Sequence, residues 1–114
     1  MSNGMELPLE VDCQTLHSAL QAAQPMLLID CREPDEYALV KIVGARLMPM
    51  STLTEHVQEL ADSRELPIVV HCHHGGRSLR VARWLRSQGY PTAQSLRGGI
   101  DQWAVEIDPS LPRY

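Results

Sequence analysis

Continuous runs of apolar residues alternate along the chain with segments in which apolar residues recur at helical spacing, and this pattern predicts alternating strands and helices. Continuous apolar runs at Met26–Asp30 and at Ile68–His71 are typical of strands that are buried on both faces. Shorter extended segments are expected at Leu9–Val11, Gly44–Pro49 and Thr92–Leu96. Strands that alternate with helices indicate an α/β fold with a mainly parallel sheet.

Helices are expected in the segments between these strands. Asp12 is a candidate N-cap for a helix over Cys13–Ala23, and a short helix is expected over Asp35–Leu39. Ser51 is expected to cap a third helix, which runs to about Ala61.

The helix expected from Arg77 onward has one apolar and one polar face. A rotation of about 100° per residue separates a face that packs on the sheet from a face in water. The first face holds Ser78, Val81, Ala82 and Leu85, and the second holds Arg80, Arg83 and Ser87. Gly89 is expected to end this helix, and Trp103 is expected to pack as core on a terminal helix.

Cys72 is the residue on which the candidate chemistry depends. It stands at the end of a predicted strand, ahead of a glycine-containing loop and a helix. Ligands of parallel α/β sheets bind beyond the carboxyl ends of the strands, and a helix N-terminus favours an anion. The position therefore predicts a lowered thiol pKa and a nucleophilic thiolate. The alternative is a small buried cysteine that ends a core strand.

The loop after Cys72 has the composition of an anion site. Gly75 and Gly76 are expected to adopt positive-φ turns that point backbone N–H groups inward. Arg77 adds a permanent positive charge. His73 and His74 are expected to line the pocket, where either would lower the thiol pKa or donate a hydrogen bond to a substrate oxygen.

Three separated motifs resemble those of rhodanese-like single-domain sulfurtransferases. The loop Cys-His-His-Gly-Gly-Arg-Ser at 72–78 is similar to the active-site loop of that family. The segment Leu27–Tyr37 is similar to its apolar strand followed by Asp-x-Arg-Glu and Glu-Tyr. Leu96–Ile100, followed by Trp103, resembles its Gly-Gly and Trp signature. One departure is Val40-Lys41-Ile42, where the family usually carries Gly-His-Ile.

This resemblance implies a rhodanese-like fold, with a small sheet of about five mainly parallel strands and helices on both faces. The domain is expected over residues 8–108, between an N-terminal tail at 1–7 and a C-terminal tail at 109–114. Cys72 is the implied catalytic residue. The implied substrate- and anion-binding loop comprises His73, His74, Gly75, Gly76, Arg77 and Ser78. Structural support is expected from Asp30, Arg32, Gly98 and Gly99.

The supporting residues have separate local roles. Asp30 and Arg32 lie two apart at the end of a strand, so they share a face and are expected to form a structural pair that fixes the turn. Cys31 points the opposite way and is expected in the core. Gly98 and Gly99 are expected to form a second turn close to Cys72.

By the same resemblance, Cys72 would attack the sulfane sulfur of a small anionic donor such as thiosulfate, release sulfite and keep the sulfur as a persulfide. A thiol, cyanide or a sulfur-relay protein would then accept it. No cofactor is implied. His71, Cys72, His73 and His74 in a row also suggest a metal, but neighbouring strand residues alternate in direction and no second cluster has ligand spacing, so no metal is expected.

Two functions of other classes remain open. A Cdc25-like phosphatase or arsenate reductase would use the same thiolate, but its loop has five residues between cysteine and arginine, whereas this chain has four between Cys72 and Arg77. The second alternative is a non-catalytic interaction module on the same fold. If Cys72 reacts with iodoacetamide no faster than free cysteine does, the interaction module is favoured over the enzyme.

Composition narrows the class of protein further. The chain has 114 residues, 44% of them hydrophobic, which indicates one globular domain. Its formal charge of −4 argues against nucleic acid as a partner. Three widely spaced cysteines do not make a disulfide framework, and no apolar run is long enough for a membrane span. A reducing, cytoplasmic location is therefore expected.

Overall fold

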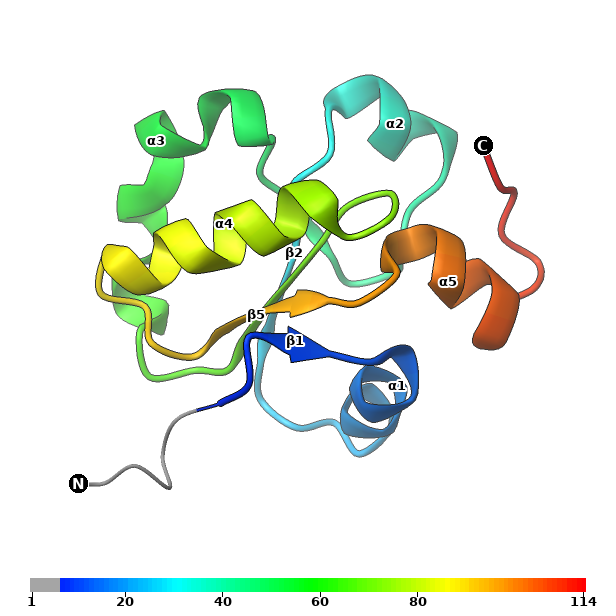
Figure 1. The fold of residues 1–114 in the computed structure, drawn as a ribbon, viewed down its shortest axis with the longest axis horizontal. Coiled ribbons are helices and arrows are strands. Elements are labelled where there is room, and N and C mark those ends of the chain that lie inside the picture. Colours follow the sequence, from blue (N-terminus) through cyan, green and yellow to red (C-terminus); the bar gives the residue numbers. More distant parts are fainter. Residues whose placement is uncertain (1–6) are drawn as a thin grey trace.

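The computed structural model describes residues 7–114 and contains one five-stranded sheet (Figure 1). All of the strand pairings are parallel, and the strand order is β1-β5-β4-β2-β3. The strands are β1 (Glu10–Val11), β2 (Leu27–Asp30), β3 (Arg46–Leu47), β4 (Ile68–His71) and β5 (Ala93–Leu96). The five expected strands and the parallel sheet are confirmed, although several strands are shorter than the sequence pattern suggests.

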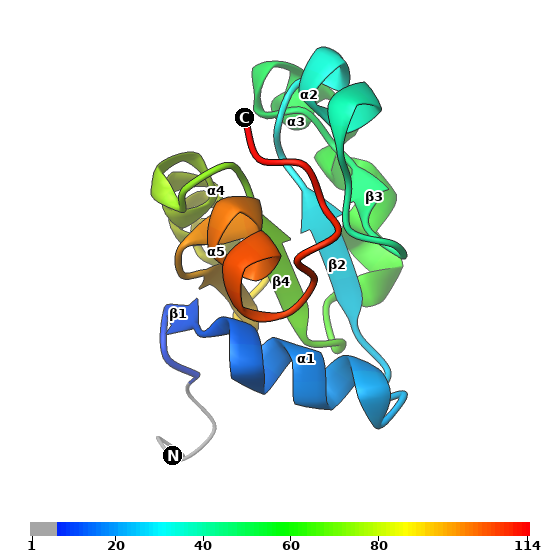
Figure 2. The same cartoon turned by 90° about the vertical axis from the view of Figure 1, so that its right-hand side faces the viewer.

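Helices lie on both faces of this sheet, as predicted (Figure 2). One core cluster joins the sheet to α3 and α4, and the other joins it to α1 and α5. The α-helices are α1 (Cys13–Gln21), α2 (Pro34–Leu39), α3 (Leu53–His56), α4 (Gly76–Ser87) and α5 (Gly99–Glu106). Two 3₁₀ segments, η2 (Met50–Thr52) and η3 (Val57–Ser63), flank α3.

Local sequence signals placed most of these helices correctly. The Asp12 carboxylate caps α1 by accepting a hydrogen bond of 2.8 Å from the backbone N–H of Thr15. The helix ends at Gln21, two residues earlier than predicted, and Ala23 just beyond it has a positive φ of 54°. Helix α4 buries the four residues expected on its apolar face. Trp103 is 5% exposed and packs in the core, as predicted.

The prediction for residues 51–61 was wrong in detail. Instead of one helix capped by Ser51, the chain forms the short α3 between two 3₁₀ segments. The Ser51 hydroxyl is not free to cap, because it donates a hydrogen bond of 2.7 Å to the carboxylate of Glu33. Leu53 and Leu60 are nevertheless buried, so the segment still packs on the core although its helix geometry differs from the prediction.

A buried ion pair ties the end of β2 to its surroundings. Asp30 and Arg32 are both fully buried, and two guanidinium nitrogens lie 2.9 and 2.6 Å from the two carboxylate oxygens. Arg32 also donates to the backbone carbonyls of Val40 and Glu36, at 2.6 and 3.2 Å. The predicted structural pair is confirmed, and Arg32 also holds the backbone at Val40, where the chain departs from the family pattern.

The segment predicted as a C-terminal tail packs against the domain. It runs from the end of α5 toward α2 (Figure 2). The guanidinium of Arg113 donates two hydrogen bonds, of 2.9 and 3.1 Å, to the carboxylate of Asp101. Of the tail predicted at 1–7, residues 1–6 lie outside the described residues, and the carbonyl of Leu7 accepts from Arg86 at 2.9 Å. No helix within residues 7–114 is long and apolar enough to cross a membrane.

Removing one partner of the buried pair is expected to destabilise the fold strongly. Asp30→Ala leaves the Arg32 charge buried without its counter-ion, which costs about 3–5 kcal/mol of unfolding free energy. Glu59→Ala is the matched control, because the ion pair of Glu59 with Arg46 is half exposed and screened by water. Urea unfolding of both variants measures the difference. Equal, small losses would contradict the structural role of the pair.

Candidate functional site

Cys72 follows the last residue of β4 and precedes the loop that leads into α4. Its Sγ accepts a hydrogen bond of 3.1 Å from the backbone N–H of Gly75 and another of 3.3 Å from that of Ser78. The Ser78 hydroxyl lies 3.4 Å from the same sulfur. The side chain is almost completely buried, at 1% exposure. The loop therefore wraps the sulfur with donors, which is the arrangement expected for an anion.

Glycine is needed at one of the two predicted loop positions. Gly75 has a φ of +111°, and a Cβ there would lie 3.3 Å from the backbone nitrogen of Gly98. Gly76 does not have a positive φ, and a Cβ at that position would meet nothing within 4 Å. The prediction of positive-φ turns at both residues is thus confirmed for Gly75 and wrong for Gly76, because Gly76 is already the first residue of α4.

The second glycine turn lies against the cysteine loop, as predicted. A Cβ at Gly99 would come within 2.6 Å of the Cys72 carbonyl oxygen and closer still to that of His73. Because the two backbones lie so close together, the first N–H groups of α5 can donate to the loop carbonyls. The N–H of Ile100 donates to the Cys72 carbonyl at 2.9 Å, and that of Asp101 donates to the His73 carbonyl at 3.1 Å. The start of α5 therefore holds the backbone of the loop from outside.

The surroundings of Sγ favour the thiolate. The pKa of Cys72 is lowered to about 4, because hydrogen bonds from Cys31, from the Ser78 hydroxyl and from the N–H groups of Ser78 and Gly75 outweigh the opposing effect of burial. Ser95 extends this network, since its hydroxyl lies 2.7 Å from the Ser78 hydroxyl. The sequence-based expectation of a lowered thiol pKa agrees with this geometry, and the nucleophilic role of Cys72 stays a prediction.

The other two cysteines behave differently. Cys31 is fully buried in the core, as predicted, but it also faces Cys72 and stays a thiol, because hydrogen bonding to Cys72 and burial raise its pKa. Burial also raises the pKa of Cys13, to about 11. Cys72 is thus the cysteine whose thiolate is favoured at neutral pH.

Arg77 lies beside the loop with its guanidinium turned to α2. Its two terminal nitrogens donate to the two carboxylate oxygens of Glu36, at 2.7 and 2.9 Å. This pairing lowers the pKa of Glu36 to about 2. Arg77 therefore fastens the start of α4 to α2, and its expected contact with the anionic end of a donor stays a prediction.

The loop histidines stack at the edge of the site. His73 lies between the ring of His74, with 3.9 Å between centroids, and the ring of Tyr114, at 3.8 Å. The Tyr114 hydroxyl donates to Glu36 at 2.8 Å and accepts from Arg32 at 3.0 Å. The main causes that lower the pKa of Cys72 include neither histidine, so the expectation that His73 or His74 would do so finds no support.

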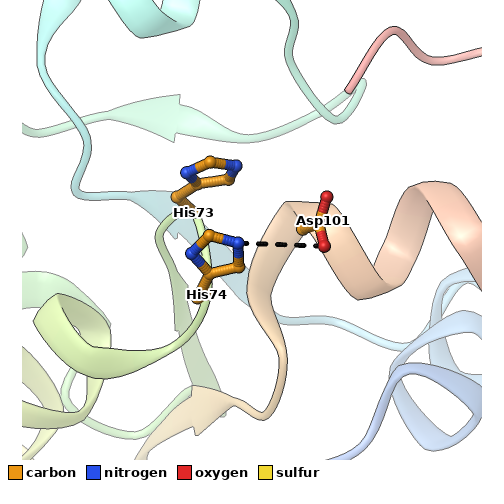
Figure 3. Close-up of side chains that lie close together, drawn as sticks. All are labelled: His73, His74 and Asp101. Carbon is orange, nitrogen blue, oxygen red and sulfur yellow. Dashed lines mark ion pairs between the residues drawn. The ribbon is translucent and has the colours of Figure 1, made fainter. Parts of the chain in front are cut away.

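His73, His74 and Asp101 are a group that could hold a metal ion (Figure 3). One ligand atom from each lies within 4.8 Å of the others, and His74 Nε2 is 3.8 Å from the Asp101 carboxylate. That carboxylate already forms two hydrogen bonds with Arg113. His71 is separate from this group, because it is fully buried and lies 3.8 Å from Asp30.

Comparison with known proteins identifies the family. Residues 12–106 match the Rhodanese-like domain family, and the chain belongs to it. A protein from Allochromatium vinosum named Sulfurtransferase is 35% identical over 83% of this chain and 87% of its own length. The Rhodanese-like/PpiC domain-containing protein 12, chloroplastic, of Arabidopsis thaliana is 33% identical over 92% of this chain but only 37% of that protein.

A solved structure supports the same assignment. The crystal structure of thiosulfate sulfurtransferase from Pseudomonas aeruginosa superposes with a TM-score of 0.79 at 26% identity, and it covers 91% of this chain and 20% of that one. The resemblance inferred from the three motifs is thus confirmed, as is the α/β fold. The chain spans well under half of the longer relatives, so it corresponds to one domain of those proteins.

Four residues of the site were not predicted as such from the sequence. Glu36 belongs to the Glu-Tyr motif, which could have indicated its role, and Cys31 and Ser95 looked like ordinary strand residues. Tyr114 gave no local signal, because only the path of the chain after α5 brings its ring onto His73.

Loss of one donor to Sγ is expected to raise the pKa of Cys72. Ser78→Ala removes the hydroxyl but keeps the backbone N–H, and a hydrogen bond to a charged group is worth about 1.5–3 kcal/mol, or about one to two pKa units. Alkylation by iodoacetamide should therefore slow at acidic pH and match wild type near neutral pH. Ser87→Ala, at the exposed end of α4, is the control. Identical pH profiles for Ser78→Ala and wild type would contradict the assignment.

Proposed function

We propose that this protein transfers a sulfane sulfur from a small anionic donor such as thiosulfate to a thiol or cyanide acceptor, through a persulfide on Cys72. The observation that carries this proposal is the Cys72 Sγ held by the N–H groups of Gly75 and Ser78. Membership of the rhodanese-like family supports it, as do the relatives named as a sulfurtransferase and a thiosulfate sulfurtransferase.

The chemistry follows from the ionised sulfur. The Cys72 thiolate attacks the outer sulfur of thiosulfate, the new S–S bond forms, and the old S–S bond breaks with its electron pair leaving on sulfite. The persulfide then carries one negative charge on its terminal sulfur. The N–H groups that face Sγ in the free protein are placed to donate to that charge, and no proton has to move in this step.

The second half of the cycle restores the thiolate. A thiol, cyanide or a sulfur-relay protein attacks the terminal sulfur, and Cys72 leaves as the low-pKa thiolate, which is a good leaving group. Arg77 carries a permanent positive charge, and its ion pair with Glu36 keeps this charge beside the cysteine loop.

The size of the loop favours sulfur over phosphate. Only four residues separate Cys72 from Arg77, and two of the loop N–H groups already point at a single atom. A loop of this length fits one sulfur better than a tetrahedral oxyanion.

The cellular location of the protein stays a prediction. A cytoplasmic location is expected from the sequence, whereas the relative from Arabidopsis is named as chloroplastic.

Thiosulfate is expected to load one sulfur atom onto the reduced protein. The intact mass of wild type should rise by the mass of one sulfur, and cyanide should remove it with the formation of thiocyanate. Cys72→Ala should show neither change. Cys13→Ser is the matched control, because that cysteine is buried in the other core, and it should load as wild type does.

Three results would contradict the proposal. Equal loading of Cys72→Ala and wild type would place the sulfur elsewhere. Turnover of an aryl phosphate that depends on Cys72 would favour the phosphatase alternative. A wild-type protein that neither loads sulfur nor reacts with iodoacetamide faster than free cysteine would favour the interaction module.

A further inference from the structure

Two cysteines stand side by side at the ends of neighbouring strands. Strands β2 and β4 lie side by side (Figure 2). Asp30, the last residue of β2, pairs with His71, the last residue of β4, and Cys31 and Cys72 follow directly after these strand ends. The backbone N–H of Cys31 donates to the His71 carbonyl at 3.0 Å, so the alignment continues past the strand ends. Both side chains enter the same core cluster, on the face covered by α4.

This placement satisfies the first requirement for a disulfide. Neighbouring strands lie about 4.7–4.9 Å apart, and disulfides join residues whose Cα atoms are about 4.4–6.8 Å apart. In the structure both cysteines are free. Both side chains are buried in the same core cluster, and each changes the pKa of the other, as neighbouring sulfurs do. Little movement of the backbone is therefore needed to join them.

We propose that Cys31 is a resolving cysteine, which forms a disulfide with Cys72 after a peroxide has oxidised Cys72. In the first step the Cys72 thiolate attacks one peroxide oxygen, the O–O bond breaks, and hydroxide leaves. Cys72 is oxidised by two electrons to a sulfenic acid, and the peroxide is reduced. In the second step the Cys31 sulfur attacks the Cys72 sulfur, the S–O bond breaks, and the Cys31 proton leaves with the hydroxyl group as water.

The surroundings of Cys31 keep its side chain protonated, and therefore a poor nucleophile, until Cys72 is oxidised. Hydrogen bonding to Cys72, burial and the negative charge of Cys72 together raise the pKa of Cys31. Cys31 therefore stays a thiol during sulfur transfer and does not attack the persulfide. A sulfenic acid at Cys72 is neutral, so the charge disappears and the hydrogen bond to a thiolate is lost. Oxidation of Cys72 thus makes Cys31 easier to ionise at the moment when it is needed.

The consequence is protection of the reactive sulfur. A thiolate with a low pKa is oxidised beyond the sulfenic acid to irreversible sulfinic and sulfonic acids unless another thiol captures it. The raised pKa of Cys31 keeps it a thiol, and a thiol reacts with peroxide far more slowly than a thiolate, so Cys31 remains reduced for this purpose. A dithiol such as dithiothreitol would reopen the disulfide by exchange and restore the Cys72 thiolate.

The test is the response of the reduced protein to hydrogen peroxide. Wild type should lose the mass of two hydrogen atoms, and a peptide map without reductant should join the peptides of Cys31 and Cys72. Reactivity of Cys72 toward iodoacetamide should disappear and return fully with dithiothreitol. Cys13→Ser should behave as wild type, because Cys13 lies in the other core.

Cys31→Ser should lose the protection of Cys72 against irreversible oxidation. Its Cys72 should gain two or three oxygen atoms at the same peroxide dose, and dithiothreitol should restore several-fold less reactivity than in wild type. Wild-type Cys72 that accumulates sulfinic acid as fast as the variant, without the Cys31–Cys72 peptide, would overturn the proposal. The wild-type peptide map decides the question even if Cys31→Ser folds poorly. None of these measurements requires sulfur transfer. The disulfide can therefore be tested even if the protein does not have the proposed sulfurtransferase activity.

Discussion

The site depends on the stabilisation of one negative charge on a buried sulfur. An isolated thiolate at 1% exposure would be costly, because burial disfavours a charge. The loop compensates with two backbone N–H groups and a hydroxyl, and Cys31 adds a thiol from the neighbouring strand. Backbone donors of this kind are fixed before any substrate arrives, so no reorganisation is needed when charge moves onto a second sulfur.

The fold around the loop keeps these donors in place. The Asp30–Arg32 pair fixes the end of β2, which carries Cys31 next to Cys72. On the other side, α5 holds the loop carbonyls through Gly99, where a side chain would collide with the backbone of His73. Arg77 joins the start of α4 to α2 through Glu36. The ends of β2 and β4 and the starts of α4 and α5 therefore surround the cysteine loop.

Much of this arrangement could be predicted from the sequence. The buried strands, the apolar face of α4 and the cysteine loop are local patterns, and each was placed within a few residues. The Ser51 cap was wrong because its hydroxyl bonds Glu33, a residue distant in the sequence.

The other unpredicted features have the same origin. Which of Gly75 and Gly76 needs a positive φ depends on where α4 begins, and this is not visible in composition. Cys31 was correctly placed in the core, but its contact with Cys72 follows from the pairing of β2 with β4. Tyr114 reaches His73 only because of the path that the chain takes after α5.

The ionisation of Cys72 is the most direct test of whether the loop stabilises a negative charge on the sulfur. The ultraviolet absorbance of thiolate, recorded against pH for wild type minus Cys72→Ser, isolates this one group. We expect one thiolate at neutral pH, with a pKa of about 4. A difference signal that appears only near the ordinary cysteine value of about 8.5 would contradict it, because the loop would then hold a thiol and not an anion.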